Sequence, residues 1–325
     1  MQLYAAISKR IRKEAMIGLL LGATQLAVPA AAPMPVNAEA APVTSALSND
    51  NSWPLDYVHG LVNLELLDHH LTPRGIDLQN KGVVFQSLVR LDWDLYRPQP
   101  AEDQMIDEIS LTTAVWNDFD SRKSGADPGR WNEIDAIFGP NVTFLKAWTL
   151  EAPIICFRSE TGSFATCWAW NPRLTYHDQM TTNFSINPYV EFFDELRNKI
   201  TVVFNPATSQ SSYYGVAGIT PTYCFTKVPL KLELPTYILI PGGSFYQRAD
   251  GLGGGTDLAM IATTLRATVP LAFVSSDRAK WSLFAAVQYD HLYNTGLLDG
   301  NQVTGTDSSR EPNVMVLHGG VNFRF

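Results

Sequence analysis

The chain has 325 residues, of which 46% are hydrophobic and 11% aromatic but only 17% charged, and its formal net charge is −8. The mean hydropathy of −0.05 excludes a bundle of membrane helices, which needs repeated apolar runs of about 20 residues. The low charge and the many aromatic side chains argue against disorder, and the acidic balance argues against a nucleic-acid partner. Barrels and sandwiches built of β-strands both have this kind of composition.

The N-terminal region has the three-part order of an export signal. Basic residues come first, an apolar stretch over residues 15–32 follows, and small residues lead to candidate cleavage sites at Ala38 and Ala40. This order predicts a secretory signal peptide over residues 1–40. A membrane anchor helix is the alternative, but Pro29, Pro33 and Pro35 interrupt the apolar stretch. We expect a flexible periplasmic lead-in over residues 41–56 and a barrel over residues 57–325.

Residues 83–95 alternate apolar and polar side chains. Val89, Leu91 and Trp93 share one face, whereas Arg90 and Asp92 share the other. Successive side chains of a strand point to opposite faces, so this pattern predicts a strand with one apolar and one polar face. Its length of about 13 residues exceeds the common 5–6 residues of soluble strands and suits a strand that crosses a membrane.

The same alternation recurs along the chain and predicts about twelve strands. Long links follow most odd-numbered strands, and short links such as Gly139-Pro140-Asn141 follow most even-numbered ones. This layout is typical of bacterial outer-membrane barrels, with both chain ends in the periplasm. We therefore expect an all-β fold, a transmembrane antiparallel up-and-down barrel of about 12 strands. The strands are expected to start near Tyr57, Val83, Glu108, Asn132, Val142, Phe164, Asn183, Tyr213, Leu230, Asp257, Trp281 and Asn313.

Strand length and outward aromatic residues favour a barrel over a β-sandwich, which would show the same alternation. A sheet in lipid must close on itself, because no backbone donor or acceptor can stay unpaired there. Aromatic rings gather at membrane interfaces, and several fall on the outward face near the expected strand ends. This predicted aromatic girdle consists of Trp93, Trp281, Tyr289, Phe323 and Phe325.

The final residues, from Val321 to Phe325, resemble the closing strand of Gram-negative outer-membrane proteins, which characteristically ends in Phe. Residues 72–80, 187–194 and 212–218 resemble stretches of the TorF-like porin family. The resemblance covers most of residues 57–325. It implies an outer-membrane barrel without catalytic residues, embedded in lipid, whose Phe325 is read by the barrel-insertion machinery. Three cysteines depart from this pattern, since such barrels usually lack them.

Charged side chains of both signs fall in the inward phase of the predicted strands. Charges inside a pore set its electric field and favour small polar solutes. The alternative is a solvated or cross-paired lining without selectivity, because side chains nearly fill a barrel of this size. Mixed signs predict weak ion selectivity in both cases. The predicted pore-lining residues are Arg90, Asp92, Asp94, Lys231, Glu233, Arg266, Asp290 and Arg324.

Two cysteines flank a predicted hairpin. If Thr161 and Gly162 form its centre, Cys156 stands opposite Cys167. Directly opposite Cβ atoms lie about 4.5–5.5 Å apart, which is longer than a disulfide prefers. Two interpretations thus stay open for Cys156 and Cys167: a possible disulfide, or two small apolar side chains without a bond. Cys224 has no predicted cysteine partner in either case.

His69 and His70 lie beside Asp68 in the first long loop. A metal site is one interpretation, but solvated loop histidines are the simpler one. No His lies at ligand spacing from a Cys, so we expect no metal. The glycine-rich residues 251–255 are not followed by a helical pattern and are expected to form a loop rather than a phosphate site.

Three functions fit such a chain: a passive channel, an enzyme carried by a barrel, and a closed barrel with a structural or adhesive role. His291 beside Asp290 is the nearest fragment of a catalytic set, without a nucleophile, so we expect no enzyme activity and no cofactor. A porin-like channel for small polar solutes is the preferred function. The expected partners are outer-membrane lipid, the insertion machinery and small solutes, while the oligomeric state is not predicted.

Overall fold

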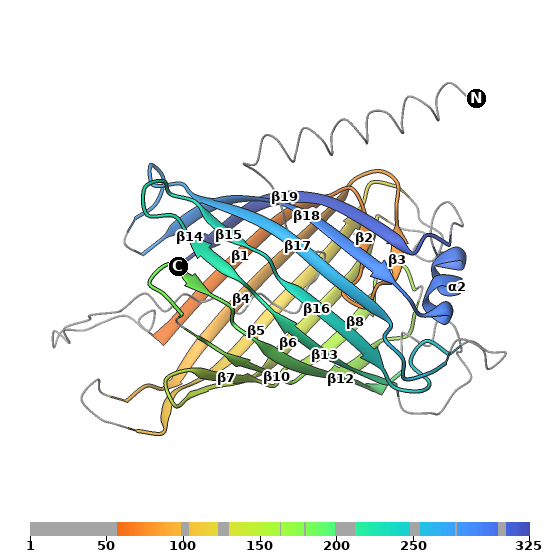
Figure 1. Cartoon of the computed structure of the whole chain (residues 1–325), viewed down its shortest axis with the longest axis horizontal. Helices are drawn as coiled ribbons and strands as arrows, with labels where there is room; N and C mark the ends of the chain where they lie inside the picture. The colour runs from red at the N-terminus through yellow and green to blue at the C-terminus, as the bar shows by residue number, and fades with distance from the viewer. Residues whose placement is uncertain are drawn as a thin grey trace.

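A computed structural model describes residues 57–98, 104–122, 130–162, 164–178, 180–198, 212–247, 254–276, 278–304 and 310–325. The predicted signal peptide and lead-in lie outside these residues. Within them, twelve antiparallel strands close into a barrel (Figure 1), which confirms the predicted fold class. The helix of the described part is α2 (Thr295–Thr304). No described helix is long and apolar enough to cross a membrane.

Seven of the twelve strands described here run without a break and are called the unbroken wall. β1 pairs with both β4 and β19, so the first and last strands close the barrel. Gly60 N donates to Phe325 O at 2.8 Å across this closure. The seven strands are β1 (Val58–Leu67), β4 (Val84–Tyr96), β5 (Ile106–Asp120), β6 (Trp131–Phe144), β17 (Met260–Pro270), β18 (Lys280–Leu292) and β19 (Asn313–Arg324).

The other five strands are each interrupted beside a proline and are called the broken wall. The prolines are Pro153, Pro172, Pro188, Pro221 and Pro235. The five interrupted strands are β7 (Trp148–Glu151) with β8 (Ile154–Ser159), β9 (Cys167–Trp170) with β10 (Arg173–Tyr176), β11 (Phe184–Ser185) with β12 (Tyr189–Arg197), β13 (Tyr213–Ile219) with β14 (Thr222–Cys224), and β15 (Lys231–Glu233) with β16 (Thr236–Pro241).

Proline explains these interruptions, because it has no backbone N–H to donate to the neighbouring strand. Its carbonyl still accepts, however. Asn171 N donates to Pro153 O at 3.0 Å, and Leu234 N donates to Pro221 O at 2.8 Å. The wall therefore stays connected across each break while losing one donor there.

The predicted turn at Gly139-Pro140-Asn141 is wrong. β6 continues through these residues to Phe144, and the chain reverses at residues 145–147, where Leu145 and Lys146 have φ of 50° and 61°. Pro140 O accepts from Ala152 N at 3.0 Å. A Cβ on Gly139 would lie 2.5 Å from Pro153 Cα. Glycine here permits a close approach of two strands rather than a turn.

The two faces of the barrel differ in polarity. Along β4 and β5, Leu88 and Trp116 are buried, whereas Val89 and Val115 are exposed. Soluble proteins expose mainly polar side chains, whereas this barrel exposes many large apolar ones and buries many charged ones. Exposed apolar residues include Leu64, Phe138, Val190, Ile240, Leu265, Leu283 and Leu317, and buried polar ones include Glu65, Gln86, Asp118, Glu133, Glu191, Gln288, Asp290 and His318.

Candidate functional site: the lumen

Residues 68–82, between β1 and β4, fold into the lumen and are called the inner segment. The segment contains the short strands β2 (His70–Leu71) and β3 (Asp77–Gln79), which pair with each other. Figure 1 shows both at the end of the barrel that carries α2, away from the C-terminus. Leu71 and Ile76 are buried in one apolar cluster with Phe193 and Leu239 of the broken wall. This cluster holds the segment inside the barrel.

The tip of the inner segment is a tight turn. Thr72 N donates to Ile76 O at 2.9 Å, and Ile76 N donates to the Thr72 hydroxyl at 3.0 Å. Gly75 has φ of 76°, and a Cβ there would lie 3.0 Å from side-chain atoms of Leu292 and Leu297. Glycine thus allows both the left-handed backbone and the close packing against α2.

Side chains far along the chain anchor the backbone of this tip. Each donates a hydrogen bond to a carbonyl of the inner segment, worth about 1 kcal/mol apiece. Tyr237 of β16, Tyr246 of the β16–β17 connection and Asn301 of α2 donate to the carbonyls of Pro73, Arg74 and Gly75 at 2.9, 2.6 and 3.0 Å.

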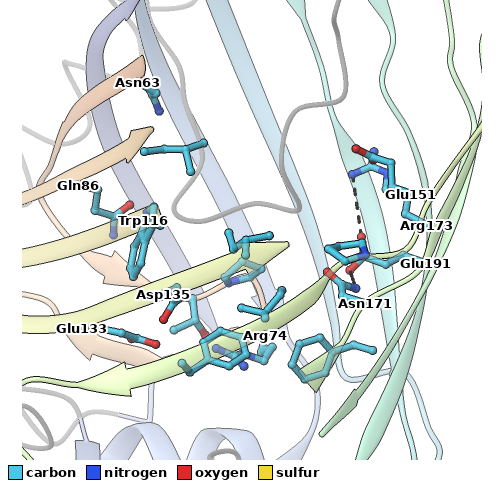
Figure 2. A pocket seen from close by; sticks show the side chains of 18 of the residues that line it. Asn63, Arg74, Gln86, Trp116, Glu133, Asp135, Glu151, Asn171, Arg173 and Glu191 are labelled. Carbon is cyan, nitrogen blue, oxygen red and sulfur yellow. Dashed lines mark hydrogen bonds and ion pairs between the residues drawn. The ribbon is translucent and has the colours of Figure 1, made fainter. Parts of the chain in front are cut away.

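A cavity of about 150 Å³ lies beside the inner segment. Both the unbroken and the broken wall contribute to its lining, so it lies inside the barrel. Figure 2 shows Gln86, Trp116, Glu133 and Asp135 on one side of it and Glu151, Asn171, Arg173 and Glu191 on the other. Charged groups from both the unbroken and the broken wall therefore border the cavity.

Arg74 extends from the inner segment between these two sides. Its guanidinium lies 5.0 Å from the ring centroid of Phe157 and 5.4 Å from that of Phe193. Figure 2 shows it close to Glu133 and Asp135. A guanidinium over aromatic faces gains about 0.5–2 kcal/mol, more when it is desolvated. Arg74 is thus a buried basic side chain that borders the cavity inside the barrel.

The remaining cavity charges are close to opposite charges. Arg173 Nη1 lies 4.0 Å from Glu191 Oε2, and its guanidinium lies 3.6 Å from the ring centroid of Tyr189. Arg90 Nη1 lies 3.7 Å from Glu151 Oε1. Adjacent opposite charges cancel at a distance, so the lumen presents local dipoles rather than a field of one sign.

His70 connects the inner segment to β5. His70 Nδ1 lies 3.0 Å from Asp118 Oδ2, and both side chains are buried. Burial lowers the pKa of His70, but the carboxylates of Asp118, Asp120 and Glu133 outweigh that effect and raise it to about 10. A buried ion pair therefore attaches the segment to the wall.

All eight predicted pore-lining residues lie in the part of the chain that the structure describes. Among these eight, Arg266 borders the cavity. Their partial or complete burial agrees with an inward position, but their role in a pore stays a prediction. Arg90 pairs with Asp92 (2.8 Å), Asp94 contacts His59 (3.1 Å), Lys231 pairs with Glu233 (3.1 Å), Asp290 accepts from Gln288 (3.0 Å), and Arg324 is half-buried at the end of β19.

Sequence reasoning missed most of the charges around the cavity. Glu133 and Asp135 have the period of two that marks one face of a strand, so this signal could have been used. Glu151, Arg173 and Glu191 lie in strand pieces shortened by proline, where alternation is harder to see. Arg74 belongs to a loop, for which no periodicity exists.

The predicted girdle residues lie at strand ends. Trp93, Tyr289 and Phe325 are 40%, 45% and 42% exposed. The rings of Trp281 and Phe323 lie 4.5 Å apart on the paired strands β18 and β19. Their contact with a membrane interface stays a prediction.

The hairpin between β8 and β9 has a register one residue away from the predicted one. Cys156 pairs with Trp168, and Phe157 pairs with Cys167. Adjacent positions on a strand point to opposite faces, so the two sulfur atoms lie on opposite sides of the sheet. The possible disulfide between Cys156 and Cys167 is accordingly absent from the structure.

No protein-family model matches this chain, and no curated protein matches it in sequence. Among solved structures, the COG4313 outer membrane channel from Pseudomonas putida F1 aligns at 10% identity with a TM-score of 0.47, covering 85% of this chain and 100% of that one. The NanC porin aligns at 8% identity with a TM-score of 0.40, covering 81% of this chain and 98% of that one. The transport unit of the Escherichia coli autotransporter AIDA-I aligns at 9% identity with a TM-score of 0.40, covering 87% of this chain and 94% of that one. The assignment of a closed barrel depends on the strand pairing described above, not on these alignments.

Proposed function

We propose that the protein is a porin-like channel of the bacterial outer membrane that passes small polar solutes without covalent chemistry. The observation that carries this proposal is the combination of an apolar outer face with a charged inner face around a cavity. The outer face suits acyl chains, and a closed sheet leaves no backbone group unpaired in lipid. The resemblance to TorF-like porins supports the same function.

Arg74 and the inner segment would form the constriction of this channel. The cavity beside them is about 150 Å³, which suits solutes of a few heavy atoms or a file of water. Charges of both signs surround it, so small polar solutes fit better than ions of one sign. The proposal therefore predicts a low conductance with weak ion selectivity.

Recording from refolded protein in a planar lipid bilayer tests the proposal. We expect discrete opening steps and a reversal potential near zero in a KCl gradient. Arg74→Gln should shift that potential toward cation preference. Arg158→Gln is the matched control, because the side chain of Arg158 on β8 is 63% exposed and pairs with Glu160 at 3.0 Å. Protein that migrates as a folded, heat-modifiable barrel yet gives no steps would exclude a channel.

A closed barrel with a structural or adhesive role is the second candidate. The observation that favours it is the inner segment, which fills one end of the lumen and is anchored by three distant side chains. This candidate predicts that neither the wild type nor Arg74→Gln gives opening steps in the bilayer. The two candidates are thus separated by the same recording.

Several accompanying assignments belong to the proposal. They are export by a signal peptide over residues 1–40, insertion guided by Phe325, and the absence of enzyme activity. Asp290 and His291 are neighbours on β18 and so point to opposite faces, which argues against a joint catalytic role. His291 Nδ1 instead contacts Asn313 Oδ1 at 2.7 Å.

A further inference from the structure

Four potential metal ligands converge where the inner segment meets the unbroken wall. They are His70 of β2, Asp118 and Asp120 of β5, and Asn132 of β6, called here the His70 cluster. One ligand atom each from His70, Asp118 and Asp120 lies within 4.8 Å of the other two. All four residues are at most 2% exposed. This burial distinguishes the cluster from the acidic groups common on protein surfaces.

The amide of Asn132 points into the cluster. Asn132 Nδ2 lies 3.4 Å from Asp118 Oδ2 and also contacts Asp120 Oδ2. Asn132 Oδ1 has no hydrogen-bond partner in the described part of the chain. A half-turn of the amide would exchange its oxygen and nitrogen. That turn would bring Oδ1 against two carboxylates, which is favourable only with a cation between them.

A second buried amide lies beside His70. Gln79 pairs directly with His70 in the two-stranded β2–β3 sheet and is fully buried. Neither atom of its amide has a hydrogen-bond partner among the described residues. Buried polar atoms without partners are uncommon and cost about 1–3 kcal/mol each. A bound ion with its water ligands would supply partners for such a group.

Acidic side chains gather around the cluster. Asp118, Asp120, Glu133 and Asp135 are all buried there, beside the two buried basic side chains of His70 and Arg74. Asp118 and Glu133 are direct cross-strand partners. Acidic side chains therefore outnumber basic ones here, and more so when His70 is the neutral imidazole that ligates a metal ion. Burying unbalanced charge is costly, and a divalent cation would offset part of this excess.

We propose that His70, Asp118, Asp120 and Asn132 bind one divalent transition-metal ion, Mn²⁺ or Zn²⁺. An imidazole ligand suits these ions, whereas Ca²⁺ and Mg²⁺ prefer oxygen ligands alone. Ligation requires the neutral imidazole, so the ring proton leaves to solvent when the ion binds. Three ligands come from the barrel wall and one from the inner segment. The ion therefore locks the inner segment to β5 and β6.

This inference does not depend on channel activity, and direct metal binding tests it. The folded full-length barrel is treated with EDTA, dialysed, and titrated calorimetrically with MnCl₂ or ZnCl₂. We expect one equivalent per chain, with little competition from a large excess of CaCl₂ or MgCl₂. His70→Gln and Asp120→Asn should each weaken binding roughly tenfold or more.

His59→Ala is the matched control, because His59 also contacts a carboxylate, Asp94 at 3.1 Å, but its side chain is 47% exposed. Its metal affinity should equal that of the wild type. Heat-modifiable migration confirms that each variant is folded, and Asp120→Asn keeps the side-chain shape if His70→Gln fails to fold. The inference is overturned if the wild type binds less than half an equivalent, if folded Asp120→Asn binds as tightly as the wild type, or if His59→Ala loses affinity as Asp120→Asn does.

Discussion

The unbroken and the broken wall build one barrel in two ways. β5 extends over 15 residues and pairs with β4 and β6 along most of that length. The longest described piece of the broken wall, β12, has nine residues. Both walls keep the same inward and outward faces through their length. A break at proline thus removes hydrogen-bond donors without changing which side chains face the lumen.

The broken wall also provides three charged side chains of the cavity. Glu151 lies just before the break at Pro153, and Arg173 follows Pro172 directly. Glu191 lies three residues after Pro188. Strands that are interrupted can spread locally, which makes room for large side chains inside a narrow barrel. Both walls therefore line the lumen, whereas the β1–β19 pair that closes the barrel belongs to the unbroken wall.

The largest expected effect comes from placing a proline in the unbroken wall. Val115 of β5 faces outward and pairs with Val89 and Ala136. Val115→Pro removes a ladder donor and should cost about 3 kcal/mol or more of unfolding free energy. Pro172→Ala in the broken wall should change it by less than about 1 kcal/mol. Urea unfolding followed by gel mobility measures both, and equal losses would remove the distinction between the walls.

Glycines at close strand approaches should give the next largest effect. A Cβ on Gly320 would lie 2.0 Å from Leu64 O in the continuous β1–β19 pair. Gly320→Ala should therefore cost about 2–3 kcal/mol by overpacking. Gly139→Ala should cost less, because β8 can shift at the break beside Pro153.

Gly215→Ala is the control for this pair, because its nearest neighbouring atom lies 4.0 Å away. It should change unfolding free energy by less than about 0.5 kcal/mol. Equal losses for Gly320→Ala and Gly139→Ala would show that the breaks do not relieve strain.

Hydrogen exchange should reveal the same contrast without mutation. Amides on either side of the five prolines should exchange about tenfold faster than mid-strand amides of β5 and β18, since local opening there breaks fewer bonds. Mass spectrometry of the barrel in detergent micelles measures these rates. Uniform protection around the barrel would contradict a weaker broken wall.

The smallest expected effect concerns outward aromatic pairs. The rings of Trp281 and Phe323 lie 4.5 Å apart in the unbroken wall, and those of Trp170 and Phe192 lie 6.4 Å apart in the broken wall. Trp281→Ala should lose about 1 kcal/mol of pair energy and Trp170→Ala about half of that. Thermal unfolding in lipid vesicles measures the stability lost by each variant. A larger loss for Trp170→Ala than for Trp281→Ala would show that contact with lipid, rather than with the partner ring, determines the stability lost.

The alternation of apolar and polar side chains predicted the number of strands, because this pattern depends only on neighbouring residues. The strands of the broken wall keep the same alternation across each break. Proline was harder to interpret, since Pro140 continues β6 and is not part of a turn. The inner segment gave no local signal. Its position depends on partners such as Tyr237 and Asn301, which are 164 and 226 residues from the carbonyls they bind. Contacts of that separation cannot be found from a periodic pattern.

That separation also bears on assembly. Along the chain, Tyr237, Tyr246 and Asn301 follow the inner-segment carbonyls that they bind by 164 to 226 residues. Closing such long loops has an entropic cost that no contact offsets until those residues arrive. The inner segment therefore acquires its fixed position only after strands from the last third of the chain have joined the sheet.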